Sequence, residues 1–298
     1  MKILLLGENG QLGWELQRAL APLGELLSME PKFRIPCTGN AAQLDELAAA
    51  VRQSAPQLIV NAAAYTAVDK AEDEPELAQR INAWLPEMLA REAAGLGAWL
   101  VHYSTDYVFD GSGQTPWRED SPTAPLNVYG RTKLEGELAI RASGCRHLIL
   151  RSSWLYAARG DNFVRRILQL ASDRERIDVV DDQVGAPTGA DLLADLTAHM
   201  VRSVQNRPEL GGTYHAAASG YSSWHGFARF IVDFARATAH PVKVAADGLM
   251  AVPSGAFPAR AQRPLNSRLD CSKLQRVFGL ELPDWRQGVE RMLRETLT

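Results

Sequence analysis

Residues 2–24, KILLLGENGQLGWELQRALAPLG, decide the fold class of this chain. A short aliphatic run ends at Gly7, and two more glycines, Gly10 and Gly13, follow it. From Trp14 onward apolar residues recur among polar ones, as they do along one face of a helix. The stretch therefore predicts a strand, a glycine turn and an amphipathic helix.

The three glycines suit the backbone geometry that is needed to bind the pyrophosphate of a dinucleotide. In this interpretation Gly7 permits the tight turn, Gly10 lets the backbone approach the pyrophosphate, and Gly13 lets the helix pack closely on the strand. The N-terminus of the helix then faces the phosphates. Glycines also simply make turns, but a strand before them and a helix after them favour a dinucleotide site.

The cofactor is expected to be NADPH or NADH. Glu30 lies 23 residues beyond Gly7, near the position at which an acidic residue accepts the adenosine ribose hydroxyls, and this favours NADH. Lys32 and Arg34 follow it and could instead pair with a 2′-phosphate, which favours NADPH. The choice stays open, and we expect either cofactor to be usable.

The alternation of strand and helix continues beyond the glycine loop. Residues 41–54 carry apolar side chains at helical spacing, and the apolar run LIVNAAAY begins at Leu58. Residues 72–97 predict a long helix in which Pro86 causes a kink or a break, and the run AWLVHY then predicts another strand. This order of elements indicates an α/β protein with a parallel sheet.

Composition excludes several classes of protein. The formal net charge of −3 gives no general attraction to polyanions, so nucleic acid is not expected as a partner. The three cysteines are far apart and contain no C-x-x-C, which argues against a disulfide framework and a thiolate metal site and is typical of a reducing compartment. No run of about 20 apolar residues predicts a membrane span, and no signal peptide is recognisable. We expect a cytoplasmic protein without a membrane anchor.

The segment from His102 to Lys133 contains the candidate chemistry. Ser104 and Thr105 follow the run AWLVHY, and Tyr129 lies four positions before Lys133. If that spacing is helical, phenol and ammonium share one face and point into one cleft. A phenol with a pKa near 10 is a poor proton donor near pH 7 unless a neighbouring charge stabilises the tyrosinate, and Lys133 would supply that charge. A core tyrosine and a solvated lysine are the structural alternative, and Ser104 could share the role of Thr105.

The loop PARAQRPLNSRLD carries Arg260, Arg263 and Asn266. Arginine matches the geometry of a phosphate with two parallel hydrogen bonds, which suits a nucleotide diphosphate. Surface arginines on a mobile loop are an equal alternative. Of the three residues, Arg263 is expected to lie nearest the substrate.

Motifs in a fixed order give the chain a family resemblance. They are LLGENGQLGWELQRAL, VNAAAYTAVDKAE, HYSTDYVFDG, PLNVYGRTKLEGE, RSSWLYA, DDQVGAPTGADLLAD, YHAAASG, RPLNSRLD and LPDW. Over nearly its whole length the chain resembles the extended short-chain dehydrogenase/reductase family. The resemblance implies a doubly wound parallel-sheet Rossmann fold with a smaller C-terminal substrate-binding domain. The branch whose motifs match uses NAD(P)H to reduce the C4 keto group of a nucleotide sugar, dTDP-4-dehydro-L-rhamnose, to dTDP-L-rhamnose for surface polysaccharide.

The resemblance also implies roles for single residues. Contacts to the cofactor are implied for Gly10, Gln11, Leu12, Glu30, Ala64, Tyr65, Thr66 and Tyr103. Contacts to the sugar nucleotide are implied for Thr105, Asp106 and Trp154. Tyr129 is implied to be the catalytic acid and also to contact cofactor and substrate. Lys133 is then its partner, which also holds the nicotinamide ribose, and Thr105 orients the substrate carbonyl.

Two domains are expected. An NAD(P)-binding domain is predicted to cover residues 1–152 with return segments near 175–218, and a substrate-binding domain to cover 219–298 with residues near 153–174. Two other functions stay open on this fold. They are a non-catalytic NADP-binding regulatory subunit, which the intact Thr105, Tyr129 and Lys133 argue against, and a related sugar-nucleotide epimerase or dehydratase.

The histidines show no metal-ligand spacing, so the residues by themselves predict no metal site. By the resemblance, however, some family members hold Mg²⁺ with carboxylates at a dimer interface. This implies a possible homodimer and makes Glu15, Asp191 and Glu295 the candidate ligands. Three solvated charges on helix faces are the alternative.

Overall fold

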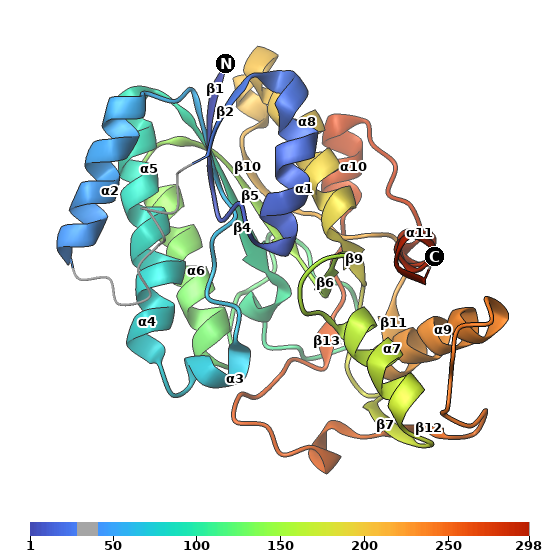
Figure 1. Cartoon of the computed structure of the whole chain (residues 1–298). Coiled ribbons are helices and arrows are strands. Elements are labelled where there is room, and N and C mark those ends of the chain that lie inside the picture. Colours follow the sequence, from blue (N-terminus) through green and yellow to red (C-terminus); the bar gives the residue numbers. More distant parts are fainter. Residues whose placement is uncertain (29–40, 298) are drawn as a thin grey trace.

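A computed structural model describes residues 1–28 and 41–297 of the chain (Figure 1). The expectations for Glu30, Lys32 and Arg34 lie outside the described residues. Within the described part, none of the helices combines the length and the hydropathy needed to span a bilayer.

The centre of the described structure is a six-stranded parallel sheet with the strand order β10-β5-β4-β3-β1-β2. The chain leaves β1 toward β2 at one edge and then returns to place β3 on the other side of β1. Such a switch point opens a crevice at the carboxyl ends of the strands, and it makes the fold doubly wound, as predicted. The strands are β1 (Lys2–Leu6), β2 (Glu25–Ser28), β3 (Leu58–Asn61), β4 (Trp99–Thr105), β5 (Arg146–Ser152) and β10 (Gly212–His215).

Helices cover both faces of this sheet (Figure 1). Ile3 and Leu5 of β1 are buried in a core that includes residues of α1 and α8, whereas Leu4 and Leu6 are buried in a core that includes residues of α2 and α5. Alternate residues of a strand face opposite sides, so a strand covered on both faces is apolar throughout. The helices are α1 (Gln11–Leu20), α8 (Ala190–Asn206) and α10 (Ser272–Phe278) on one side, and α2 (Ala41–Ser54), α5 (Leu85–Leu96) and α6 (Val128–Ala142) on the other.

The long helix predicted over residues 72–97 is interrupted once. α4 (Pro75–Gln79) leads into a π-helical turn, Arg80–Trp84, and α5 follows directly. Pro86 lies in the first turn of α5, directly after this turn, and it lacks a backbone N–H and crowds the carbonyl four residues earlier. The expected disturbance at Pro86 therefore takes the form of one wider turn. The short helix α3 (Val68–Ala71) precedes α4.

A second core lies beside the main sheet. Phe227, Ile231 and Trp285 are buried there together with Ile167 and Val179. Val179 lies within residues 175–218, which the sequence predicts to belong to the first domain, and the domain boundaries stay a prediction. The elements on this side are β6 (Leu155–Tyr156), α7 (Phe163–Asp173), β7 (Ile177–Val180), β8 (Val184–Gly185), β9 (Thr188–Gly189), β11 (Ser222–Ser223), α9 (Trp224–Ala237), β12 (Leu249–Val252), β13 (Asn266–Ser267) and α11 (Trp285–Leu297).

Candidate active site

The glycine loop between β1 and α1 packs closely against the backbone that follows β3. Gly7 has φ +81°, and a Cβ at this position would lie 2.6 Å from the backbone nitrogen of Ala63. A Cβ on Gly13 would overlap the carbonyl oxygen of Gly7. Gly10 has ordinary φ and precedes α1 without a side-chain cap. The fold itself therefore requires Gly7 and Gly13, whereas Gly10 leaves the first N–H groups of α1 open.

The side chains of the first two residues of α1, Gln11 and Leu12, lie in different surroundings. The side-chain amide of Gln11 donates to the carbonyl of Asp161 (3.3 Å) and accepts from Asn162 (3.1 Å). Leu12 is buried in the core beneath the sheet. Only the backbone of Leu12 is thus available to a ligand at this helix end.

The segment after β3 is fixed by a residue that the sequence did not single out. Asn82, on the π-helical turn, accepts from the backbone N–H of Tyr65 (2.9 Å) and donates to its carbonyl (3.1 Å). It also contacts the hydroxyl of Thr132 on α6 (3.2 Å). Ala64 and Thr66 flank this clamp and are exposed. One sequence signal could have pointed to Asn82, because the helix distortion expected near Pro86 takes the form of the wide turn that contains Asn82.

Tyr129 and Thr105 meet at the carboxyl edge of β4. Thr105 is the last residue of β4, and Tyr129 lies in the first turn of α6, whose N-cap is Asn127. Burial raises the pKa of Tyr129 to about 12, a hydrogen bond with Thr105 opposes this rise, and the charge of Asp106 adds to it. The hydroxyl of Thr105 also contacts Asp106 (3.2 Å). The predicted acid and the predicted orienting hydroxyl are therefore in contact.

Lys133 lies one helical turn beyond Tyr129 and is 1% exposed. Its Nζ donates to the carbonyl of Tyr103 (2.5 Å) and lies 3.2 Å from Nε2 of His102. Burial lowers the pKa of Lys133 to about 8, and Glu137 opposes this shift. The ring of Tyr103 faces the opposite side of the sheet, where its hydroxyl contacts Thr197 of α8 (2.8 Å). Tyr103 thus reaches Lys133 through its backbone.

Asp106 is a buried carboxyl group beside the candidate catalytic residues Thr105 and Tyr129. It is 2% exposed, and within the described residues its Oδ2 has no hydrogen-bond partner. Burial raises its pKa to about 7, while a hydrogen bond with Ser267 of β13 opposes the rise. An unpartnered carboxylate oxygen of this kind is a ready acceptor for a ligand hydroxyl.

The loop of residues 258–270, called the arginine loop below, forms ion pairs with α3 and with the residues just after it. Arg263 forms a two-pronged ion pair with Asp69 (2.6 and 3.2 Å), which holds the pKa of that carboxyl below its usual value. Arg260 pairs with Asp73. Tyr107 contacts Arg263, and its ring lies edge-on to Tyr129 at 5.6 Å. The side chain of Tyr107 therefore lies between Arg263 and the candidate acid Tyr129.

A cavity of about 1050 Å³ opens beside Arg263. Trp154, which was predicted to line the sugar pocket, has φ +48° and stacks on Trp224 at 3.7 Å. Trp224 itself lines the cavity, whereas Trp154 is not one of the described lining residues and contacts Trp224. The other polar and aromatic residues of the lining include Asp69, Phe163, Arg166, Gln183 and Arg260.

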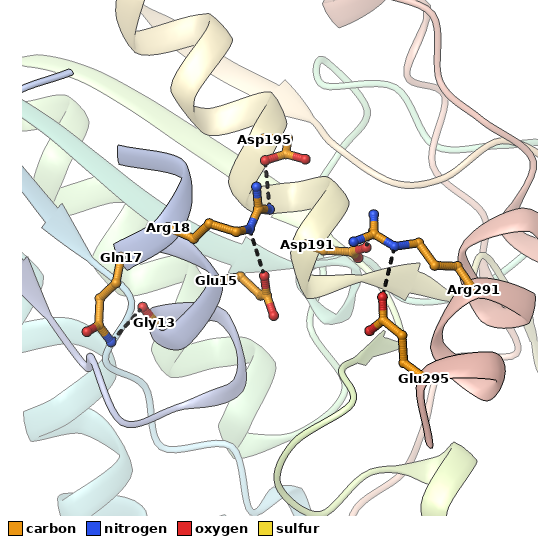
Figure 2. A network of polar contacts seen from close by, with 8 residues as sticks. All are labelled: Gly13, Glu15, Gln17, Arg18, Asp191, Asp195, Arg291 and Glu295. Atoms are coloured by element: carbon orange, nitrogen blue, oxygen red, sulfur yellow. Dashed lines mark hydrogen bonds and ion pairs between the residues drawn. The ribbon is translucent and has the colours of Figure 1, made fainter. Parts of the chain in front are cut away.

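The three candidate Mg²⁺ ligands are held by arginines (Figure 2). Glu15 pairs with Arg18 (3.3 Å), while Arg291 pairs with both Asp191 (3.4 Å) and Glu295 (3.2 Å). Among the described residues, no group of three or more His, Cys, Asp or Glu side chains could hold a metal ion. The expected Mg²⁺ site is therefore not supported, because guanidinium groups already neutralise the carboxylates.

Comparison with known proteins agrees with this geometry. The model of the RmlD substrate binding domain matches residues 1–298. A dTDP-4-dehydrorhamnose reductase from Escherichia coli K12 is 52% identical over 298 residues, which cover 100% of this chain and 99% of that protein, and one from Shigella flexneri is 51% identical with the same coverage.

Solved structures of the same kind superpose closely. A dTDP-4-dehydrorhamnose reductase from Clostridium acetobutylicum has a TM-score of 0.87 at 34% identity and full coverage of both chains. One from Bacillus anthracis, in complex with NADP, has a TM-score of 0.85 at 35% identity and 99% coverage of both. With the family model matched along its whole length, the chain belongs to the RmlD family of dTDP-4-dehydrorhamnose reductases.

Proposed function

We infer that this protein uses NADPH or NADH to reduce the C4 keto group of dTDP-4-dehydro-L-rhamnose, forming dTDP-L-rhamnose. The observation that carries this proposal is the contact between Thr105 and Tyr129 at the edge of β4, with Lys133 one turn further along α6. A proton donor, an orienting hydroxyl and a buried cation are the protein groups that carbonyl reduction needs.

The residues of the glycine loop fit a dinucleotide. A Cβ on Gly7 or Gly13 would fill the space that the loop needs in order to pass the end of β3, and the start of α1 carries no side-chain cap. We assign the diphosphate to the backbone of Gly10, Gln11 and Leu12. Ala64, Tyr65, Thr66 and the carbonyl side of Tyr103 would border the nicotinamide half. The cofactor supplies the hydride to the carbonyl carbon.

Tyr129 delivers the proton to the oxygen of the reduced carbonyl. Its pKa of about 12 in the described structure makes the phenol a weak acid on its own. The ammonium of Lys133 stabilises the tyrosinate that remains, and Thr105 donates to the carbonyl oxygen as negative charge builds on it. Asp106, with its unpartnered oxygen, accepts from a sugar hydroxyl.

The cavity beside Arg263 is the proposed place for the nucleotide diphosphate. Arg260 and Arg263 both line it, and arginine binds phosphate oxygens in pairs. The ion pairs with Asp69 and Asp73 are partly exposed to solvent, so a diphosphate can replace these carboxylates at little cost. Trp224 lines the same cavity, and Trp154 stacks on its ring.

One assay tests the proposal. Purified protein is mixed with dTDP-4-dehydro-L-rhamnose and either NADPH or NADH, and the absorbance of the reduced nicotinamide is followed. Loss of absorbance with the sugar nucleotide, and none without it, is the expected result. No oxidation with either cofactor would instead support a regulatory subunit, and conversion of the sugar nucleotide without net oxidation would support an epimerase or dehydratase. The same assay with UDP- and GDP-linked ketosugars tests the base.

A further inference from the structure

Two buried polar side chains connect the end of β3 with the catalytic helix. Asn61 ends β3 and is 1% exposed, and it stands opposite His102 of β4, which is 0% exposed. Nδ2 of Asn61 lies 3.1 Å from Nδ1 of His102. On its other side, Nε2 of His102 lies 3.2 Å from Nζ of Lys133. The proposed mechanism leaves both Asn61 and His102 without a role.

The donors and acceptors along this chain can be assigned in order. Oδ1 of Asn61 accepts from the backbone N–H of Ala63 (3.2 Å), so the NH₂ group of Asn61 faces His102. Nδ1 of His102 must then accept, and a neutral imidazole carries its one proton on Nε2. Burial, followed by the charge of Lys133, holds the pKa of His102 well below its usual range, so the ring is neutral. The N–H on Nε2 therefore points at Lys133.

This order of hydrogen bonds suits only one form of Lys133. A neutral amine can accept from Nε2 of His102 while it donates to the carbonyl of Tyr103. An ammonium has no lone pair and would place two donors against each other. We propose that Asn61 and His102 are positioning residues that favour the neutral amine of Lys133 over its ammonium.

The other charged groups around Lys133 do not cancel this effect. Glu137, on the same helix, faces Lys133, but Arg151 of β5 takes both of its carboxylate oxygens (2.8 and 2.6 Å). Tyr129, from the first turn of α6, is a neutral phenol at neutral pH. Burial of Lys133 lowers its pKa in the same direction as the His102 contact. The balance between amine and ammonium thus lies near pH 8.

The catalytic consequence rests on the proposed function. Lys133 helps Tyr129 only while it is an ammonium, because the neutral amine does not stabilise a tyrosinate. The pair Asn61 and His102 therefore sets the pH above which the reduction rate falls. Substitutions of Asn61 or His102 that remove the preference for the neutral amine of Lys133 should move this limit to higher pH.

The test measures the protonation of Lys133 directly. Protein with isotope-labelled lysine is titrated by NMR without substrate, and Lys133→Met identifies the resonance among the six lysines. In His102→Gln, the side-chain carbonyl can turn toward Nζ and accept from the ammonium. We expect the pKa of Lys133 to rise by about 1 to 2 pH units, the effect of one hydrogen bond to a charged group.

Asn61→Asp provides a second, independent variant. A carboxylate accepts from both Ala63 and Nδ1 of His102, which moves the imidazole proton to Nδ1 and lets Nε2 accept from Lys133. The pKa of Lys133 should rise here as well. His215→Gln is the matched control, because this buried histidine lies on β10, where the charged groups that act on its pKa are Arg151 and Asp270. It should leave the pKa of Lys133 unchanged.

The outcomes are separable. A pKa of Lys133 that falls or stays constant in His102→Gln overturns the inference, and if that variant does not fold, the same result in Asn61→Asp overturns it. A rise in pKa supports it, and the alkaline limit of kcat should then move upward by the same amount. If the pKa rises as stated but the unsubstituted protein oxidises no cofactor in the reductase assay, the proposed function fails and the inference stands.

Discussion

The candidate catalytic cluster (Thr105, Asp106, Tyr129 and Lys133) and the arginine loop (residues 258–270) hold their charged groups in different environments. Lys133 is 1% exposed and contacts a carbonyl and an imidazole, whereas the side chains of Arg260 and Arg263 are 66% and 28% exposed and contact carboxylates. A buried charge without a close counter-ion has a strongly shifted pKa, and a partly exposed ion pair contributes little to stability. In the proposed function, the first arrangement keeps Lys133 close to its titration point beside the proton donor Tyr129, and the second keeps two arginines available to a diphosphate. Four experiments test this contrast.

The largest effect is expected inside the catalytic cluster. Tyr129→Phe removes the proton donor and should lower kcat by about 10² to 10⁴, with binding of the cofactor largely kept. Steady-state kinetics and a cofactor titration measure the two properties. Tyr214→Phe, which removes a hydroxyl bonded to the carbonyl of Leu210, is the matched control and should turn over normally. Near normal turnover in Tyr129→Phe would remove this residue from the mechanism.

The burial of Lys133 should also make the stability of the protein depend on pH. Because the pKa of Lys133 falls from 10.5 to about 8 on folding, the unfolded chain binds more protons between these pH values. The free energy of unfolding should therefore rise with pH across this window, by an amount on the order of 3 kcal/mol. Urea unfolding at several pH values measures it, and Lys133→Met should flatten the rise. Equal slopes in both proteins would show that Lys133 is not the group responsible.

A smaller effect is expected from the glycine loop that borders the cluster. Gly13→Ala places a Cβ against the carbonyl of Gly7, and overpacking of this kind costs about 1 to 3 kcal/mol. Thermal unfolding and cofactor affinity should both decrease. Gly95→Ala is the control, since a Cβ there meets no described atom within 4 Å and alanine favours the helix. A Gly13→Ala protein as stable as Gly95→Ala would contradict the close approach of α1 to the loop.

The smallest effect is expected at the arginine loop. Arg263→Ala should raise KM for the sugar nucleotide by about 10-fold, the loss of one hydrogen bond to a charged group, while the affinity for NADPH is kept. Arg286→Ala, which removes an exposed arginine paired with Asp284, is the control and should leave KM unchanged. If Arg263→Ala also leaves KM unchanged, this residue does not bind the substrate.

Much of the candidate site followed from local patterns, and the rest depended on residues distant in sequence. The interval between Tyr129 and Lys133 predicts a shared helix face, and α6 provides that helix. The partner of Lys133 could not be predicted in the same way, because His102 reaches it only through the packing of α6 on β4. Asn82 and Asn61 were likewise missed, since their roles depend on which strand or helix lies opposite.

The sequence by itself determined the strand, turn and helix around Gly7 and Gly13. Glycine is needed there for local reasons, because Gly7 has a positive φ and a Cβ on Gly13 would meet the carbonyl of Gly7 six residues earlier. Only the tertiary structure decided that the ring of Tyr103 turns away from the site, that Arg263 rests on Asp69, and that Arg291 holds two of the expected metal ligands. The physical reason is that contacts between distant residues depend on strand register and the paths of loops, which no local spacing encodes.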